Sequence, residues 1–430
     1  MKVFKFGGAS VKDTEGVKNV AKIMKRFSGE NILVVVSAMG KTTNALERLV
    51  QSYFYKKGDS AAILEEIKQY HFDIIRQLFP DVVHPVYNEI NNAFVELDWA
   101  VEGSPIKDYD FEYDQVVSVG EIISSKIVSA YLHESGIQNK WLDARDYVKT
   151  DNTYREGKVD WQFTEKLAKE NPLFKLQIPK HSNTQTLITQ GFIGVTSENY
   201  TTTLGREGSD YSAAIFAYIF DAESVTIWKD VPGVLNADPK WFKDTVMLDR
   251  ISYRDAIELA YYGASVIHPK TIQPLQNKNI PLYVKSFLNP DSKGTIISAD
   301  SNALPVPSFI FKVNQVLISI LPKDFSFIIE ENLSDIFSLF ARQRIKINVM
   351  QNTAISFSVS VDNDPLKIPA LIRALQEHYK VKYNENMELI TIRHYDQETI
   401  DRVTEGKQII LELKSRNTVQ LVCKQLTIDN

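Results

Sequence analysis

The sequence predicts an α/β fold with a mainly parallel central sheet, followed by a smaller α+β region. Residues 32–36 form an unbroken aliphatic run rich in valine, which is typical of a strand buried on both faces of a parallel sheet. Several predicted strands run directly into glycines and then into segments with helical periodicity. Around residues 304–307, a proline-rich stretch, the elements become shorter, so we expect a second domain to begin there.

The composition is that of an ordinary globular protein. The 430 residues suggest two or three domains at about 150 residues each. The net charge of −5 argues against a nucleic-acid or anionic-membrane partner. The single cysteine, Cys423, cannot form an intramolecular disulfide, and we expect it to be a buried structural thiol. With no signal-peptide pattern and no membrane-length apolar run, the expected location is the cytoplasm.

The first strand, residues 3–6, carries Lys5 and runs into Gly7 and Gly8. Two adjacent glycines let the backbone turn sharply and expose its N–H groups to an anion, and Lys5 adds a positive charge. The spacing matches neither a P-loop nor a Rossmann fingerprint, so another kind of phosphate site is predicted. A plain architectural turn is the alternative.

Helical periodicity follows at residues 13–27, and most of 45–112 is predicted to be a helical excursion from the sheet. The loop 37–44 follows a buried strand, so we expect it to face the same crevice as Gly7 and Gly8. His71 and His84 are expected to be solvated or to cap helices.

Residues 114–134 are predicted to form one helix that contains Gly120 and Glu121. A glycine inside a helix costs about 1 kcal/mol relative to alanine, which suggests a packing or functional reason. Two interpretations stay open: a functional carboxylate, or close helix packing with Glu121 in water.

A second anion site is predicted where Gly205 and Gly208 flank Arg206, ahead of a helix from about residue 211. Ser209 or Asp210 is expected at the N-cap, where free N–H groups and the helix dipole attract anions. A strand at 225–228 then delivers Lys229 and Asp230, which turn chemistry alone could also explain.

Beyond the boundary, the pattern predicts a βαββαβ-like unit and a partial second copy. Neither copy contains a convincing catalytic constellation, so regulation or dimerisation is expected. The predicted strands are 309–320, 345–350, 354–361, 387–393, 407–413 and 417–423, and the predicted helices are 330–342, 365–378 and 396–404.

Basic, glycine-marked loops at strand ends are typical of phosphoryl transfer, which needs positioned cations and N–H dipoles. A carboxylate acceptor has a reference pKa of about 4, so it is ionised at neutral pH and needs no general base. The lack of a poised histidine is consistent with such an acceptor.

The sequence resembles the aspartate kinases of the amino-acid kinase superfamily over residues 1 to about 296, and its tail resembles their tandem ACT domains. The matching motifs are Lys5-Phe6-Gly7-Gly8-Ala9-Ser10, Ser118-Val119-Gly120-Glu121, Gln190-Gly191-Phe192-Ile193-Gly194, Thr202 to Tyr211, and Glu258-Leu259-Ala260-Tyr261-Tyr262-Gly263-Ala264. The resemblance implies a three-layer catalytic domain at 1–304 and a ferredoxin-like ACT region at 305–430 whose second copy is shortened.

It also implies transfer of phosphate from ATP, with Mg²⁺, to the side chain of L-aspartate. Lys5, Glu121, Arg206 and Asp210 would be catalytic, and no residue is directly assigned to the metal. The implied aspartate-binding residues are Ser37, Thr43, Glu121, Arg206 and Ser209. The implied nucleotide-binding residues are Lys5, Gly7, Gly8, Ser10, Gly205, Lys229, Asp230, Lys240 and Lys270.

Some positions depart from the family's pattern. Glu207 stands where the family has glycine and is expected to point away from the phosphates. Ser265 stands where a phosphate-binding lysine is usual, so Lys270 or Lys229 is expected to supply that charge.

The resemblance further implies a homodimer formed through the ACT domains and a lysine or threonine effector. Asn332, Leu333, Asn348 and Thr353 are the implied effector-binding residues. Two alternatives remain: a kinase for another amino-acid carboxylate, such as glutamate, and a catalytically silent sensor of nucleotide or amino acid.

Overall fold

The computed structural model describes residues 1–170, 185–264, 267–300, 306–324 and 326–426. Its contacts divide the chain into two compact units. The first contains residues 1–234, 249–257 and 266–303, and the second contains 235–248, 258–265 and 304–430.

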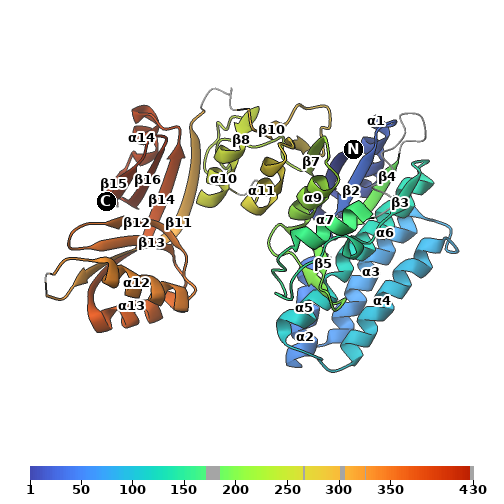
Figure 1. The fold of residues 1–430 in the computed structure, drawn as a ribbon, viewed down its shortest axis with the longest axis horizontal. Helices are drawn as coiled ribbons and strands as arrows, with labels where there is room; N and C mark the ends of the chain where they lie inside the picture. Colours follow the sequence, from blue (N-terminus) through green and yellow to red (C-terminus); the bar gives the residue numbers. More distant parts are fainter. Residues whose placement is uncertain (171–184, 265–266, 301–305, 325, 427–430) are drawn as a thin grey trace. The chain divides into compact units, whose positions relative to one another are not determined.

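The first unit is built on an eight-stranded sheet in the order β3-β4-β2-β1-β7-β9-β10-β8 (Figure 1). All its strand pairs are parallel except β9–β10, which confirms the predicted mainly parallel sheet. The strands are β1 Lys2–Phe6, β2 Ile32–Val36, β3 Asn139–Trp141, β4 Thr186–Gln190, β7 Ser224–Lys229, β8 Arg250–Ser252, β9 Leu282–Ser286 and β10 Thr295–Ser298. A separate hairpin joins β5 Ile193–Val195 to β6 Thr201–Thr203.

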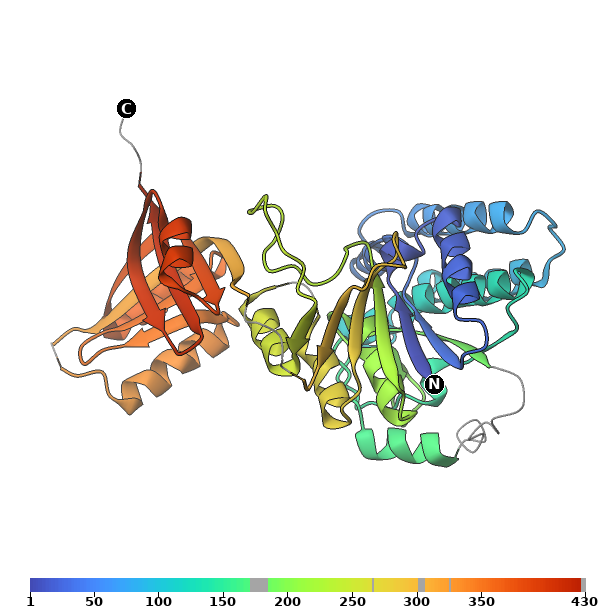
Figure 2. The same cartoon turned by 90° about the horizontal axis from the view of Figure 1, so that it is seen from above.

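Helices cover both faces of this sheet (Figure 2). The apolar sides of α1 (Thr14–Arg26) and α6 (Val119–Glu134) share a core with Phe4 and Phe6 of β1. Because side chains alternate along a strand, Lys5 points to the opposite face, where α9 (Gly208–Ile219) packs on β1. The alternation of β1 therefore separates its aromatic anchors from its lysine.

The helical excursion predicted from residue 45 is present. It consists of α2 Thr42–Tyr55, α3 Ser60–Leu78, α4 Pro85–Glu102 and α5 Tyr109–Val117. The remaining elements of the first unit are α7 Trp161–Glu170, α11 Pro269–Asn277, η1 Gly8–Ser10 and η2 Ala144–Asp146, and α10 Tyr253–Tyr262 belongs partly to each unit.

Two local predictions are wrong. The segment 114–134 is not one helix, because α5 ends and α6 begins at Ser118, whose hydroxyl donates to the carbonyl of Gln115. His71 is fully buried rather than solvated, with Nδ1 2.7 Å from the Ile67 carbonyl, and burial lowers its pKa to about 4. His84 does cap a helix, because its Nδ1 accepts from the Val86 N–H.

The second unit contains a six-stranded antiparallel sheet in the order β12-β13-β11-β14-β16-β15. Two 15-residue strands, β11 Ser308–Pro322 and β14 Tyr379–Arg393, run through its centre, and both copies of the predicted repeat share them. The other elements are α12 Glu330–Arg342, β12 Ile347–Asn352, β13 Phe357–Asp362, α13 Lys367–His378, α14 Gln397–Thr404, β15 Lys407–Lys414 and β16 Thr418–Gln425. Cys423 is buried on β16, as predicted.

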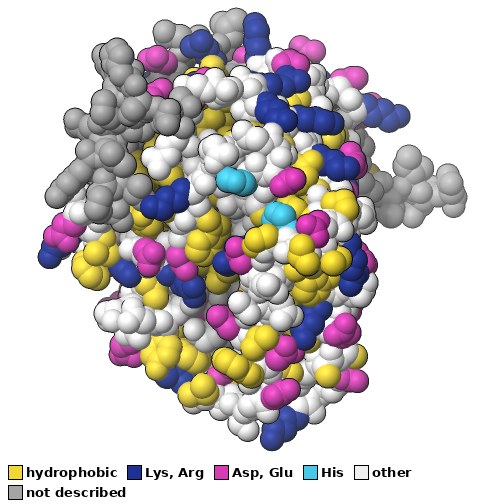
Figure 3. All heavy atoms as spheres, turned by 90° about the vertical axis from the view of Figure 1, so that its right-hand side faces the viewer, with side chains coloured by type: hydrophobic (Ala, Val, Ile, Leu, Met, Phe, Trp, Pro, Cys, Tyr) yellow, Lys and Arg dark blue, Asp and Glu magenta, His cyan; other side chains and the backbone are white. Residues whose placement is uncertain are grey.

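Charges of both signs are interspersed on the face of the first unit shown in Figure 3. This pattern fits the small net charge of −5. Among the described helices, none is long and apolar enough to cross a membrane.

Candidate active site

The loops that follow β1 and β2 are held against each other. The N–H of Gly40 donates to the carbonyl of Gly8 over 3.0 Å, and the N–H of Ser37 donates to the carbonyl of Phe6 over 3.1 Å. A Cβ atom at Gly8 would lie only 2.7 Å from the Ala38 carbonyl oxygen, so only glycine permits this approach. The two loops therefore lie against each other at the same end of the sheet.

Asp210 is the electrostatic centre of the site. It lies in the first turn of α9, and its two carboxylate oxygens face Lys5 Nζ at 2.6 Å and Lys229 Nζ at 3.6 Å. Asp210 is buried, but the two ammonium groups keep the pKa of its carboxyl below the usual value. Strands β1 and β7 thus each direct one lysine at the start of α9.

Glu121 is buried at the start of α6, not solvated. It accepts a hydrogen bond from the Ala38 N–H, and Lys5 lies close enough to favour its ionised form. Burial nevertheless raises the pKa of Glu121 to about 8, and its Oε2 has no hydrogen-bond partner among the described residues. This carboxylate is available for a cationic ligand group.

Gly120 brings Glu121 into place. A Cβ atom at position 120 would lie 2.9 Å from Leu46 Cδ1 and 3.1 Å from Thr42 Cγ2, so the glycine allows α6 to pack tightly on α2. Close helix packing therefore explains Gly120, but Glu121 is buried and not in water, as that interpretation assumed.

The loop from β6 to α9 carries the second predicted anion site. Gly205 has a φ of +76°, and Glu207, the N-cap of α9, has a φ of +55°. Ser209 and Asp210 lie inside the helix, so the predicted N-cap is wrong by two or three residues. The Arg206 side chain is exposed and has no ion pair among the described residues, whereas Glu207 Oε2 is shielded from solvent and has no hydrogen-bond partner there.

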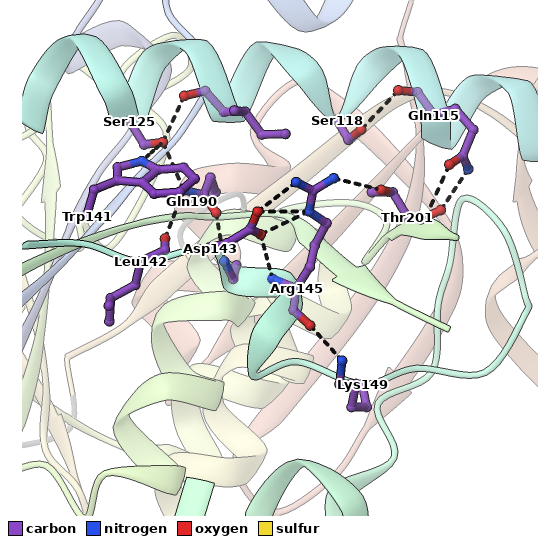
Figure 4. Close-up of polar contacts among 12 residues, drawn as sticks. Gln115, Ser118, Ser125, Trp141, Leu142, Asp143, Arg145, Lys149, Gln190 and Thr201 are labelled. Atoms are coloured by element: carbon purple, nitrogen blue, oxygen red, sulfur yellow. Dashed lines mark hydrogen bonds and ion pairs between the residues drawn. The ribbon is translucent and has the colours of Figure 1, made fainter. Parts of the chain in front are cut away.

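A polar network holds the loop that follows β3 in place (Figure 4). The Gln190 carboxamide at the end of β4 accepts from the Ala144 N–H and donates to Ser125 Oγ and the Leu142 carbonyl. The Arg145 guanidinium binds both oxygens of Asp143 and also donates to Thr201 Oγ1. These contacts fix the loop after β3 to α6 and to the β5–β6 hairpin.

Sequence reasoning missed Asp114, a fully buried carboxylate on α5. It accepts from Thr203 N at 2.9 Å, from Thr203 Oγ1 at 2.7 Å and from Arg155 N at 2.9 Å. Burial raises the pKa of Asp114 to about 7 despite these donors. A usable signal was present, because Asp114 and Glu121 are seven residues apart, a spacing that places two acids on one side of a helical segment.

The structure brings some of the other predicted residues to the strand ends. Ser37 directly follows β2, and its carbonyl accepts from Ser124 Oγ at 2.6 Å. Ser10 is buried in η1, Thr43 is partly buried in the first turn of α2, and Asp230 is exposed directly after β7.

Among the described residues, the ion pairs of Asp210 include neither Lys270 nor Lys240. Lys270 is exposed at the start of α11, where its N–H donates to His268 Nδ1. Lys240 belongs to the second unit, and Ser265 lies outside the described residues.

The residues predicted to bind an effector make local contacts in the second unit. Asn332 Oδ1 accepts from the Ile329 N–H, and Thr353 Oγ1 accepts from the Ser356 N–H. Asn348 accepts from Lys312 Nζ and donates to Gln315 and Asp362. Leu333 packs against the core between α12, α13 and the sheet.

Within the described part of the chain, no group of three or more His, Cys, Asp or Glu side chains could hold a metal ion. Mg²⁺ in phosphoryl-transfer sites typically has one or two carboxylate ligands together with substrate phosphates and water. The nearby carboxylates of Asp210 and Asp230 are compatible with such a nucleotide-borne ion.

The amino acid kinase family matches residues 1–286. The chain is 29% identical to lysine-sensitive aspartokinase 3 of Escherichia coli over 98% of this chain and 92% of that protein. It is 34% identical to the chloroplastic bifunctional aspartokinase/homoserine dehydrogenase 2 of Arabidopsis thaliana over 69% of this chain, but spans only 32% of that protein.

Among solved structures, the chain resembles E. coli aspartokinase III in complex with aspartate and ADP. The TM-score is 0.80 at 26% sequence identity, and the match covers 98% of this chain and 96% of that one.

The two glycines after β1 should respond differently to alanine. Gly8→Ala places a methyl group against backbone carbonyls of the β2 loop, so we expect a loss of about 1–3 kcal/mol in the free energy of unfolding. Gly7→Ala would contact only Lys5 Nζ, at 3.3 Å, so it should change ligand affinity more than stability. Chemical denaturation of both variants checks this, and equal destabilisation would contradict it.

Glu121→Gln should become progressively more stable than the wild type as pH rises from about 5 to 8. The pKa of Glu121 is raised to about 8 in the fold from an ordinary value of 4.5. Its contribution to stability is therefore full at low pH and is lost as the buried carboxyl ionises. Thermal melts across this range measure the difference, and a difference that does not vary with pH would count against the assignment.

Proposed function

This chain belongs to the amino acid kinase family, and on that premise we propose that it is an aspartate kinase. It transfers the γ-phosphoryl group of ATP to the side-chain carboxylate of L-aspartate, giving ADP and 4-phospho-L-aspartate. This is the first step toward lysine, threonine and methionine, and we place it in the cytoplasm. The observation that carries the proposal is the buried Lys5–Asp210–Lys229 cluster at the strand ends, with Glu121 beside it.

The chemistry needs charge stabilisation rather than proton transfer. An oxygen of the ionised aspartate side chain attacks the γ-phosphorus as the bond from phosphorus to the β,γ-bridging oxygen breaks, and ADP leaves with that electron pair. Lys5 and Lys229 stabilise the negative charge of the transferring group, and Asp210 holds both ammonium groups in place.

Aspartate is recognised through its α-carboxylate and its α-ammonium group. The exposed Arg206 guanidinium binds the α-carboxylate bidentately, and Glu121, ionised by its cationic partner, binds the α-ammonium group. Hydroxyl groups of Ser37, Thr43 and Ser209 complete the amino-acid site.

ATP binds with its phosphates against the backbone of the glycine-marked loops at Gly7, Gly8 and Gly205. The Ser10 N–H donates to the Gly7 carbonyl, so Ser10 contributes its hydroxyl in this proposal. Asp230 and Lys240 belong to the nucleotide's surroundings in this proposal. Mg²⁺ bound to the phosphates supplies further charge neutralisation. Lys229, held 3.6 Å from Asp210, supplies the phosphate charge that Ser265 lacks, with Lys270 as the alternative donor.

An aspartate- and ATP-dependent hydroxamate assay tests the activity. The wild type should form product with L-aspartate and not with glutamate. Lys5→Ala should reduce kcat by at least about a hundredfold, because each lost electrostatic contact in such sites costs roughly 2.7–4 kcal/mol of transition-state stabilisation. The melting temperature of Lys5→Ala should change little by comparison with its kcat.

The same assay separates the alternatives. Product with glutamate only would favour a sister kinase, and no product with any amino acid would favour a silent sensor. Lys229→Ala should impair turnover more than Lys270→Ala, and full activity in both variants would exclude either lysine as the substitute cation.

A homodimer through the C-terminal sheet is also proposed, together with binding of lysine or threonine near Asn332, Leu333, Asn348 and Thr353. Support for an effector comes from the similarity to a lysine-sensitive relative. Support for the dimer comes from β12, an edge strand that carries the exposed Met350, because an unpaired strand edge readily pairs with another chain.

Charge at this edge should disrupt the dimer. Met350→Lys, at a residue 50% exposed, is expected to shift the protein to a monomer in sedimentation equilibrium. Ile410→Lys, at a residue 42% exposed on the opposite edge strand β15, is the matched control and should leave the mass unchanged. Dissociation by the second variant alone would place the interface at β15.

A further inference from the structure

Asp114 is a buried charge that the proposed chemistry does not use. It is fully inaccessible to solvent, and its carboxylate accepts three hydrogen bonds, two from Thr203 and one from the Arg155 N–H. Burying a carboxylate is unfavourable unless several donors compensate, so three converging donors indicate a position that the fold specifically requires.

Asp114 holds the edge of β6 that faces away from β5. Among the described strands, β6 pairs only with β5, which leaves its other edge without a strand partner. Neighbouring side chains of α5 replace that partner. Asp114 binds Thr203 at one end. Gln115 binds the N–H and the carbonyl of Thr201 at the other, as Figure 4 shows. The helix thus satisfies the strand edge with side chains.

The edge held by Asp114 leads directly into the loop that carries Arg206. The carbonyl of Thr203 accepts from the Gly157 N–H, and a Cβ atom at Gly205 would be 3.3 Å from the Arg155 carbonyl oxygen. Asp114 therefore holds the two backbone segments that lie next to Gly205: Thr203, which precedes it in the chain, and Arg155, which packs against it. Because the Arg206 side chain has no ion pair among the described residues, its position depends on this backbone.

The same helix leads in the other direction to Glu121. From Asp114 the chain passes through the break at Ser118 into α6, whose first turn carries Glu121. Asp114 thereby links the carboxylate and the guanidinium that face the two backbone groups of the amino-acid substrate in the proposed function.

We propose that Asp114 is a positioning residue that sets the separation of Arg206 and Glu121 and so determines the affinity for the amino-acid substrate. This inference rests on the proposed aspartate-binding site. It predicts that weakening the hydrogen bonds accepted by Asp114 affects aspartate binding far more than ATP binding or the chemical step.

The test is Asp114→Asn, which keeps the shape but removes the charge that the three donors face. Its KM for aspartate should rise at least about tenfold, because hydrogen bonds to a charged acceptor are stronger than those to a neutral one, while kcat and the KM for ATP change less than about threefold. Calorimetric titration with L-aspartate should show the same loss of affinity without requiring turnover.

Glu112→Gln is the matched control. Glu112 is a buried carboxylate on the same helix, but it accepts from Tyr53 Oη, Ile106 N and Lys107 N and makes no hydrogen bond to β6 among the described residues. This variant should lower the melting temperature without changing the KM for aspartate.

Thr203→Val adds a double-mutant cycle. It removes the hydroxyl that donates to Asp114 over 2.7 Å, so its effect on KM should largely disappear in the Asp114→Asn background. Equal increases in KM from Asp114→Asn and Glu112→Gln, or a change in melting temperature alone, would overturn the positioning role. Wild-type protein that binds aspartate without phosphorylating it would refute only the kinase activity, and wild-type protein that binds no amino acid would refute both proposals.

Discussion

The ion cluster around Asp210 is the constraint on which the first unit depends. Two lysines from neighbouring strands converge on one buried carboxylate, which would be unfavourable at that position without them. The arrangement requires β1, β7 and the start of α9 to meet at one point. It also leaves the cluster with one more positive than negative charge, which suits a site that receives anionic phosphates.

Close backbone approach makes this meeting possible. Gly8 permits the β1 and β2 loops to touch, Gly120 permits α6 to approach the same place, and Gly191 packs where any Cβ would lie 2.5 Å from Ser209 Cβ. Each of these glycines removes a side chain at a point where two loops or helices converge. Their common effect is that charged side chains from four separate segments surround a small volume.

The second unit joins two similar halves within one sheet. Strands β11 and β14 are long enough to serve both halves, so one continuous sheet results. The register between them shifts near Lys312 and Gln315, where a polar network joins the buried Gln315 to Lys312, Asn348 and the exposed Asp362. A satisfied polar network inside a sheet favours one register over its neighbours.

The sequence by itself determined the elements whose signals are local. The valine-rich run of β2, the glycines after β1 and the alternating helices and strands beyond residue 304 predict the observed order, and the motifs around Lys5 and Arg206 identify the family. The tertiary structure decided which residues contact one another. That Asp210 faces Lys5, that Glu121 and His71 are buried, and that Asp114 holds β6 all depend on contacts between residues distant in sequence. Spacing along a chain reports which face a side chain occupies, but burial, and with it the pKa, is set by what packs against that face.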